Sequence, residues 1–274
     1  MPLSDSTADI LITATRLALE AGQLLKERVG SQMDVAYKGE IDLVTDVDRA
    51  SEALIAAGIS EAHPTHAMVG EEGSTTEVSA QGAEWIWIVD PIDGTTNFAH
   101  GYPHFAVSIA VVRHGIGEVG VVYDPSRGEL FAGVRNGEAT LNGKPIQVSK
   151  TELLGRSILS TGFSYKVGDR DEQNAIWLEL HESCQGIRRE GSAALGVAWV
   201  AAGRTDGFYE RPINAWDVSA GAIIAEAAGA TVTSLLGGQY DVYGQELTVS
   251  NGLIHDQLVR AIQKTIDRPA GVAN

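Results

Sequence analysis

The sequence predicts a layered α and β fold in which antiparallel strands and alternating strand–helix segments occur together. The N-terminal part has the apolar periodicity of two helices, residues 104–148 resemble a run of short strands, and the chain after about residue 150 alternates strands with helices. No stretch is rich enough in proline, serine or charge to act as a linker. We therefore expect a single domain over residues 1–268, with an N-terminal half at 1–150 and a C-terminal half at 151–268.

The first expected element is an amphipathic helix over roughly residues 6–29, with Ser6 or Thr7 as its N-cap. Residues 30–46 show no helical period and are predicted to form a loop, and a second helix is expected over about residues 48–62. The apolar positions of the first helix recur every three or four residues, as one helix face requires: Ile10, Leu11, Ala14, Leu17, Ala18, Ala21, Leu24 and Leu25.

Strands are expected next. "HAMVGEEG" contains a short strand that runs into acidic residues, and "EWIWIVD" is apolar on both alternating faces, which indicates a sheet covered on both sides. The apolar runs of residues 104–148 are separated by turn residues and predict an antiparallel meander. "GIGEVG" in this region fits the dinucleotide-binding pattern, but a strand follows it where that pattern needs a helix, so we interpret it as a hairpin turn.

The C-terminal half is expected to contain strands at "SILSTGF" and "TDGFYE". Helices are predicted over residues 170–184, in "SAALGVAWVAAG", in "WDVSAGAIIAEAAG", which Gly229 closes, and in "LIHDQLVRAIQK".

Composition limits the class of protein and its partners. The chain of 274 residues is 44% apolar and carries a net charge of −16, which argues against nucleic acid or an anionic membrane as its main partner. Cys184 is the only cysteine, which excludes a disulfide within the chain and a CxxC metal site. The N-terminus does not resemble a signal peptide, and no stretch approaches the ~18 apolar residues of a membrane span, so we expect a cytoplasmic protein.

The segment "DPIDGTTNFAHG" follows the apolar strand with more polar residues than a change of direction needs. A turn explains one aspartate and Gly94, but Asp90 ends an otherwise apolar run, and a carboxylate buried there has to be paired or bound to a cation. Asp93 could converge with it, and Thr95 and Thr96 would begin a short helix whose free N–H groups suit an anion. A Mg²⁺–phosphate site and a turn are equally good interpretations of this segment alone.

Two further acidic segments support the first interpretation. "VGEEG" places Glu71 and Glu72 at another strand end, and "NAWDVSAG" places Asp217 in the first turn of a helix, where its charge suits the helix dipole. Taken singly, these segments would be an acidic loop and an ordinary helix start.

Together, "GEEG", "WIVDPIDGTTNFAHG" and "NAWDVSAG", in this order and at these distances, resemble the inositol monophosphatase family of lithium-sensitive, Mg²⁺-dependent sugar phosphatases. The resemblance covers nearly the whole chain, including "DLVTDVDRASE" and "GSAALGVAWVAAGRTDGFYE". It implies the α-β-α-β-α layered fold shared with fructose 1,6-bisphosphatase, a homodimer, and inhibition by Li⁺.

The resemblance also implies a set of metal ligands. Glu71, Asp90 and the backbone carbonyl of Ile92 would hold one Mg²⁺, and Asp90, Asp93 and Asp217 would hold a second. A third, weaker ion would contact Glu71 through waters, so Glu71 counts among the catalytic residues. We thus expect two to three ions per site.

The phosphate and the attacking water have their own expected residues. By resemblance, the backbone N–H groups of Gly94 and Thr95, with Thr96 nearby, would contact the phosphate. Thr95 and Asp48 would orient and deprotonate a metal-activated water that attacks the phosphorus directly. The register of "DLVT" favours Asp48 over Asp46 for this role.

Substrate recognition is assigned by the same resemblance to Asp93, the N–H of Ala193 and the carboxylate of Glu210, which would contact sugar hydroxyls. This predicts myo-inositol 1-phosphate as the substrate. Histidinol phosphate, fructose 1,6-bisphosphate and a nucleotide 3′-phosphate remain alternatives.

Three arginines and one loop are left open. Arg211 departs from the residue expected beside Glu210, and Arg188 and Arg189 are either solvated charges at a helix end or contacts to a second acidic group. The loop around Lys38 is expected to cover the metals.

Two other functions fit the sequence less well. A haloacid dehalogenase also begins at a DxDGT-like strand end, but its aspartates are two residues apart and lie near the N-terminus, unlike Asp90 and Asp93. A non-enzymatic scaffold for a partner protein is disfavoured because the expected metal ligands are all present.

Overall fold

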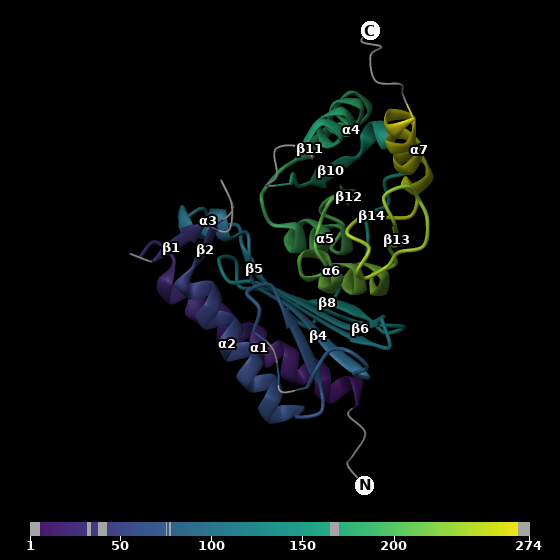
Figure 1. Ribbon diagram of the computed structural model, residues 1–274. Helices are drawn as coiled ribbons and strands as arrows, with labels where there is room; N and C mark the ends of the chain where they lie inside the picture. Colours follow the sequence, from purple (N-terminus) through teal and green to yellow (C-terminus); the bar gives the residue numbers. More distant parts are fainter. Residues whose placement is uncertain are drawn as a thin grey trace.

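In the computed structural model, the described residues form two large β-sheets that alternate with three layers of helices, and a third sheet of two short strands (Figure 1). It describes residues 6–31, 34–37, 43–74, 76, 78–164 and 170–267. A pair of helices covers the outer face of a seven-stranded sheet, a second pair lies between the two sheets, and a third pair covers the outer face of a five-stranded sheet. The expected α-β-α-β-α order is therefore confirmed.

The outer helices of the N-terminal half are α1 (Thr7–Arg28) and α2 (Asp46–Ala62). Ser6 caps α1 as predicted, since its hydroxyl accepts a hydrogen bond from a backbone N–H of the first turn. α2 begins two residues before the expected start, because Thr45 forms a capping box with Asp48 and so extends the helix toward the N-terminus.

The prediction of a plain loop over residues 30–46 is wrong. β1 (Val35–Tyr37) and β2 (Leu43–Thr45) lie in this stretch and pair antiparallel. Strands of three residues are too short to establish a visible alternation in the sequence. The loop around Lys38 lies outside the described residues.

The seven-stranded sheet confirms the predicted meander. Its strands follow one another in chain order, and the first pair is parallel while the others are antiparallel. "GIGEVG" begins in a hairpin turn as expected, with His114 and Gly115 both at positive φ. The strands are β3 (Ala67–Gly70), β4 (Trp85–Asp93), β5 (Ala106–Arg113), β6 (Ile116–Asp124), β7 (Glu129–Val134), β8 (Ala139–Leu141) and β9 (Lys144–Pro145).

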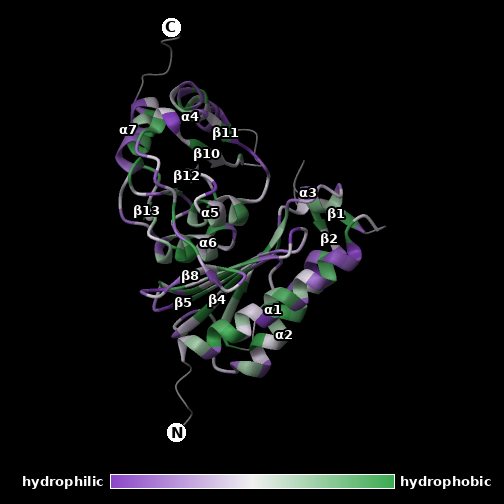
Figure 2. Cartoon of the chain, turned by 180° about the vertical axis from the view of Figure 1, so that it is seen from behind, coloured by the Kyte–Doolittle hydropathy of each residue, from purple (hydrophilic) through white to green (hydrophobic). Residues whose placement is uncertain are grey.

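Both faces of this sheet are buried, as the apolar pattern of β4 predicted. Trp87 and Val89 pack into a core cluster with α1 and α2, whereas Ile88 packs into a second cluster with α5 (Ala193–Ala201) and α6 (Ala215–Ala227). Figure 2 shows the hydrophobic residues gathered along the strands and on the helix sides that meet them. β4 therefore ends between two helical layers.

The five-stranded sheet has the order β11-β10-β12-β14-β13, and its outer face is covered by α4 (Arg170–Ser183) and α7 (His255–Ile266). The predicted helices are all present, and Gly229 closes α6 with a φ of +92°. Three short strands of this sheet were not predicted: β11, β13 and β14. The strands are β10 (Ile158–Thr161), β11 (Gly186–Arg188), β12 (Gly207–Glu210), β13 (Thr231–Thr233) and β14 (Leu247–Ser250), and a 3₁₀ turn spans Leu154–Arg156.

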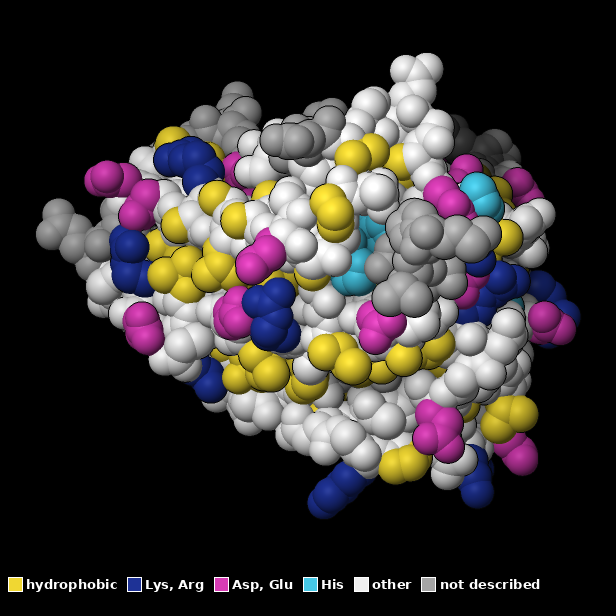
Figure 3. Space-filling view, turned by 90° about the horizontal axis from the view of Figure 1, so that it is seen from below, with side chains coloured by type: hydrophobic (Ala, Val, Ile, Leu, Met, Phe, Trp, Pro, Cys, Tyr) yellow, Lys and Arg dark blue, Asp and Glu magenta, His cyan; other side chains and the backbone are white. Residues whose placement is uncertain are grey.

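Within the described ranges, no helix has both the length and the apolar character needed to cross a membrane. The face of the molecule shown in Figure 3 carries acidic and basic side chains in alternation, without a region of one sign.

Candidate functional site

The end of β4 carries two of the predicted aspartates, and a bulge turns them to the same side. Side chains three residues apart in a regular strand point to opposite faces. In the pairing of β4 with β5, Asp90 lies opposite Ser108 and Asp93 lies opposite Ala106. β4 therefore has one more residue than β5 between these two pairs, which is a β-bulge. Asp90 also accepts a hydrogen bond from the Ile92 N–H at 2.9 Å, as in the expected turn. The segment therefore forms a turn, and the bulge also brings the two carboxylates together.

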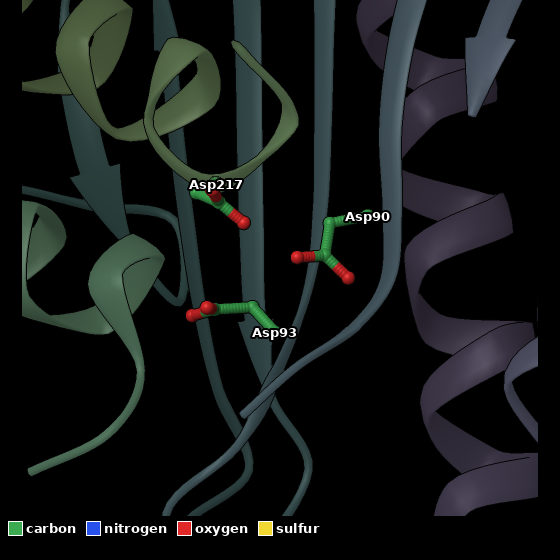
Figure 4. A group of neighbouring side chains, drawn as sticks. All are labelled: Asp90, Asp93 and Asp217. Carbon is green, nitrogen blue, oxygen red and sulfur yellow. The ribbon is translucent and has the colours of Figure 1, made fainter. Parts of the chain in front are cut away.

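Asp217 comes from the first turn of α6, the helix that covers this face of β4. Its carboxylate accepts the Asn214 N–H at 2.8 Å, which completes a capping box and fixes its direction. Asp90, Asp93 and Asp217 each offer an oxygen, and these atoms lie within 4.8 Å of one another. Figure 4 shows the three side chains directed toward a common space.

Glu71 reaches the same place from the neighbouring strand. It follows β3, which runs parallel to β4, and its N–H continues the ladder by donating to Val89 O at 3.2 Å. Parallel strands end at the same edge of a sheet, which brings Glu71 beside Asp90. The structure therefore collects four of the predicted metal-ligating side chains.

The electrostatics of this cluster suit a bound cation. Burial raises the pKa of Asp90 well above its usual range, and the negative charges of Glu71, Asp93 and Asp217 raise it further. Burial also raises the pKa of Asp217, followed by the charges of Asp93 and Glu71. A divalent cation would remove this repulsion, and an all-oxygen donor set suits Mg²⁺. The residues present therefore fit the ion that the sequence predicts.

Asp93 is held by the N-terminus of α5. Its carboxylate accepts hydrogen bonds from the hydroxyl of Ser192 and from the N–H groups of Ala193 at 3.2 Å and Ala194 at 2.9 Å. Burial raises the pKa of Asp93 to about 6, and these hydrogen bonds oppose the rise. The Ala193 N–H, predicted to contact substrate, thus contacts Asp93. Sequence reasoning missed Ser192, although a serine before an apolar helix is a recognisable N-cap.

Asp48 and Thr95 lie side by side. Thr95 Oγ1 is 3.2 Å from Asp48 Oδ1 and 3.0 Å from the Ile92 carbonyl oxygen, and its single proton can be donated to only one of them at a time. Asp48 is fully buried, whereas Asp46 points to Arg28 in a 2.7 Å ion pair. Of these two aspartates, the structure therefore places Asp48 beside Thr95.

Gly94 and Thr96 flank Thr95 at the start of α3 (Thr95–Ala99). Gly94 has a φ of +94°, and a Cβ there would lie 2.9 Å from Gly191 O, so the close approach of these two segments requires glycine. The three residues follow Asp93 directly, which puts the predicted phosphate contacts beside the carboxylate cluster.

Glu210 ends β12 and faces the cluster from the second sheet. It is buried, and its Oε2 has no hydrogen-bond partner among the described residues. Burial raises its pKa well above the usual range, and the charges of Asp217 and Asp93 add to the effect, while Arg189 lowers it. An unpartnered acceptor of this kind suits a ligand that donates a hydrogen bond.

Arg188, Arg189 and Arg211, whose roles the sequence did not decide, lie in three different environments. Arg211 forms ion pairs with Glu172 at 2.7 Å and Glu246 at 3.0 Å, so its charge is used within the protein. Arg188 is exposed, as expected of a solvated charge, but it ends strand β11, so its placement at a helix end was wrong. Arg189 is the arginine whose charge acts on Glu210.

His104, near the site, predicts a pH effect on stability. It is 2% exposed, and burial followed by the charge of Arg127 lowers its pKa from 6.5 to about 4. The folded state favours the neutral imidazole, whereas the unfolded chain protonates it more readily. The contribution of His104 to the free energy of unfolding is therefore fully present above pH 6.5 and is lost as the pH falls toward 4. We expect the wild type to lose about 2–3 kcal/mol more than His104→Phe between pH 7.5 and 4.5.

The measurement for His104 is urea unfolding of both proteins at the two pH values with saturating Mg²⁺. The buried carboxylates are common to both, so only the difference between the proteins reports on His104. Equal losses in the two proteins would contradict the assignment.

A model of the inositol monophosphatase family matches residues 7–267. The chain is 40% identical over 260 residues to a protein of Pseudomonas aeruginosa named Nus factor SuhB, covering 93% of this chain and 96% of the relative. It is 41% identical over 254 residues to an inositol-1-monophosphatase of Synechocystis, covering 92% and 88% respectively. The solved structure of an inositol monophosphatase from Anabaena superposes with a TM-score of 0.83 at 40% identity, covering 93% of this chain and 96% of that one.

Proposed function

Because the chain belongs to the inositol monophosphatase family and is a phosphatase, we propose that it hydrolyses myo-inositol 1-phosphate in a Mg²⁺-dependent reaction. The observation that carries this proposal is the convergence of Glu71, Asp90, Asp93 and Asp217 beside the pair of Thr95 and Asp48. The first group suits divalent cations, and the second suits a water molecule that has to lose a proton.

In this proposal the four carboxylates, with the carbonyl of Ile92, would hold two to three Mg²⁺ ions. Bound Mg²⁺ supplies Lewis-acid chemistry, which stabilises charge on the phosphate and on the leaving oxygen and makes water a better nucleophile.

The remaining steps belong to side chains and backbone groups of the protein. Thr95 orients the attacking water, and the buried carboxylate of Asp48 takes the proton through the hydrogen bond that joins it to Thr95. The N–H groups of Gly94 and Thr95, with Thr96 nearby, position the phosphate. Water attacks the phosphorus directly, so no covalent phosphoenzyme forms.

Substrate choice is assigned to the wall opposite the phosphate. In this proposal the unpartnered oxygen of Glu210 would accept a hydrogen bond from a sugar hydroxyl, and Asp93, whose charge acts on Glu210 and which accepts the Ala193 N–H, would border the sugar together with that N–H. A neutral polyol suits a buried carboxylate better than a second phosphate does, because two anions would repel each other. Histidinol phosphate, fructose 1,6-bisphosphate and a nucleotide 3′-phosphate are the alternatives within the same chemistry.

The test is phosphate release at saturating Mg²⁺ from inositol 1-phosphate, histidinol phosphate, fructose 1,6-bisphosphate, adenosine 3′,5′-bisphosphate and glycerol 2-phosphate. We expect the highest kcat/KM for inositol 1-phosphate, with activity lost in EDTA and inhibited by Li⁺. A higher kcat/KM for another compound would change the proposed substrate but would leave the proposed reaction mechanism intact. Activity that persists after complete metal removal would contradict the Mg²⁺ proposal.

A role with a protein partner is a second candidate, favoured by the name Nus factor that the Pseudomonas aeruginosa relative carries. Folded protein that releases no phosphate from any compound would favour this role over the enzymatic one. We also propose a cytoplasmic homodimer by analogy with the family, which light scattering of the purified protein would test.

A further inference from the structure

Helix α2 presents a row of buried polar side chains to the candidate site. Asp48, Ser51 and Glu52 are each 0% exposed, and their spacing of three and four residues puts them on one face of the helix. Asp48 contacts Thr95, and the Ser51 hydroxyl donates to the Pro91 carbonyl at 3.2 Å, between the two aspartates of β4. Glu52 is the third member, and the proposed chemistry gives it no role.

The Glu52 carboxylate binds the loop that follows β3. Its Oε2 accepts the Glu72 N–H at 2.8 Å, and its Oε1 accepts the Ser74 N–H at 2.7 Å. Hydrogen bonds to a charged acceptor are stronger than neutral ones, and a carboxylate buried this deeply needs them. A Cβ at Gly70 would collide with the same carboxylate, so the chain passes directly against it.

These contacts place Glu71 between two anchors. On one side, its own N–H donates to Val89 O at 3.2 Å, which ties it to the strand that carries Asp90. On the other side, the N–H of Glu72 is held by Glu52, which ties the loop to the helix that carries Asp48. The backbone on both sides of the Glu71 Cα is thus fixed relative to the other groups of the site.

We propose that Glu52 is a positioning residue that fixes Glu71 beside Asp90 and thereby sets the affinity of the carboxylate cluster for a divalent cation. Both oxygens of Glu52 accept backbone N–H groups of the loop that carries Glu71, so in this proposal Glu52 acts through Glu71. This proposal rests on the proposed function, because Glu52 can affect cation affinity only if the carboxylate cluster binds a cation.

The test replaces one of the two acceptors. Glu52→Gln keeps the size of the side chain, but its amide NH₂ would face one of the two N–H donors. Mn²⁺ binding, followed by the electron paramagnetic resonance signal of the free ion, is expected to weaken by about 10–100-fold, the usual effect of losing a group that orients a metal ligand. Glu61→Gln, an exposed residue of the same helix with the same change in charge, is the control and should bind Mn²⁺ within about twofold of the wild type.

Two further readouts separate positioning from a purely structural role. The Mg²⁺ concentration for half-maximal activity should rise by the same factor in Glu52→Gln, while kcat at saturating Mg²⁺ stays within about threefold of the wild type. In a Glu71→Gln background, adding Glu52→Gln should weaken Mn²⁺ binding no further, because both substitutions act on the same ligand.

An unchanged Mn²⁺ affinity in Glu52→Gln, with or without a lower Tm, would overturn the proposal, and so would a further loss of affinity in the Glu71→Gln background. If Glu52→Gln does not fold, Glu52→Asp serves as the test variant, with the same expected loss of Mn²⁺ affinity. Aspartate keeps the negative charge, but its side chain is one methylene shorter and its carboxylate lies farther from the loop. A wild type that binds no Mn²⁺ would instead contradict the proposed metal-dependent function.

Discussion

Asp90→Asn is expected to lower kcat/KM by about 10³-fold or more while leaving a folded protein. Asp90 shares the cluster with Asp93 and Asp217, and burial followed by the charges of Glu71, Asp93 and Asp217 raises its pKa. The substitution removes its charge but keeps an oxygen that can accept the Ile92 N–H, so the turn after β4 should persist. The measurement is phosphate release at saturating Mg²⁺.

The same variant should be more stable than the wild type when no metal is present. Removing one of several buried, mutually repelling charges is worth on the order of 1 kcal/mol or more, which corresponds to a Tm about 2–4 °C higher. Conversely, the rise in Tm that Mg²⁺ causes in the wild type should be largely lost.

Asp256→Asn is the matched control for Asp90→Asn, because Asp256 is an exposed residue in the first turn of α7. It should keep wild-type activity and a wild-type response to Mg²⁺. Near-normal activity of Asp90→Asn, or a metal-free Tm several degrees below that of the wild type, would contradict the assignment of Asp90 to a shared metal site.

Asp48→Asn is expected to lower kcat by about 10²–10⁴-fold, with little change in the Mg²⁺ concentration that the enzyme requires. An amide at this position cannot take a proton from Thr95 or from the water that Thr95 orients. Steady-state kinetics over a range of Mg²⁺ concentrations would separate this effect from a loss of metal binding.

The chain offers its own control two residues away. Asp46 lies in the same helical turn, but its carboxylate pairs with Arg28 at a partly exposed position. Asp46→Asn should therefore keep kcat within about twofold and lower stability by no more than about 1 kcal/mol. The assignment of the catalytic role to Asp48 would fail if Asp46→Asn lost activity and Asp48→Asn kept it.

The elements that could be predicted from the sequence are those with a long local pattern. The 22 residues of α1 repeat their apolar positions over six turns, and β4 is apolar on both faces, so periodicity identifies both. β1, β11 and β13 have three residues each, and no periodicity can be read from so few. The division of the chain into halves at residue 150 stays a prediction.

The sequence by itself determined the layered α and β class and the identity of the acidic segments, because both are encoded in patterns of neighbouring residues; the order of the layers followed from the resemblance to the family. Glu71, Asp90, Asp93 and Asp217 were all singled out in this way.

Only the tertiary structure decided how these groups meet. The bulge that turns Asp93 to the side of Asp90 depends on pairing with β5, and the engagement of Arg211 depends on Glu172 and Glu246, which are far away in the chain. Likewise, Ser192 and Glu52 are ordinary polar residues until folding buries them against Asp93 and the loop after β3. Contacts between distant segments are set by how whole elements pack, and no local pattern records them.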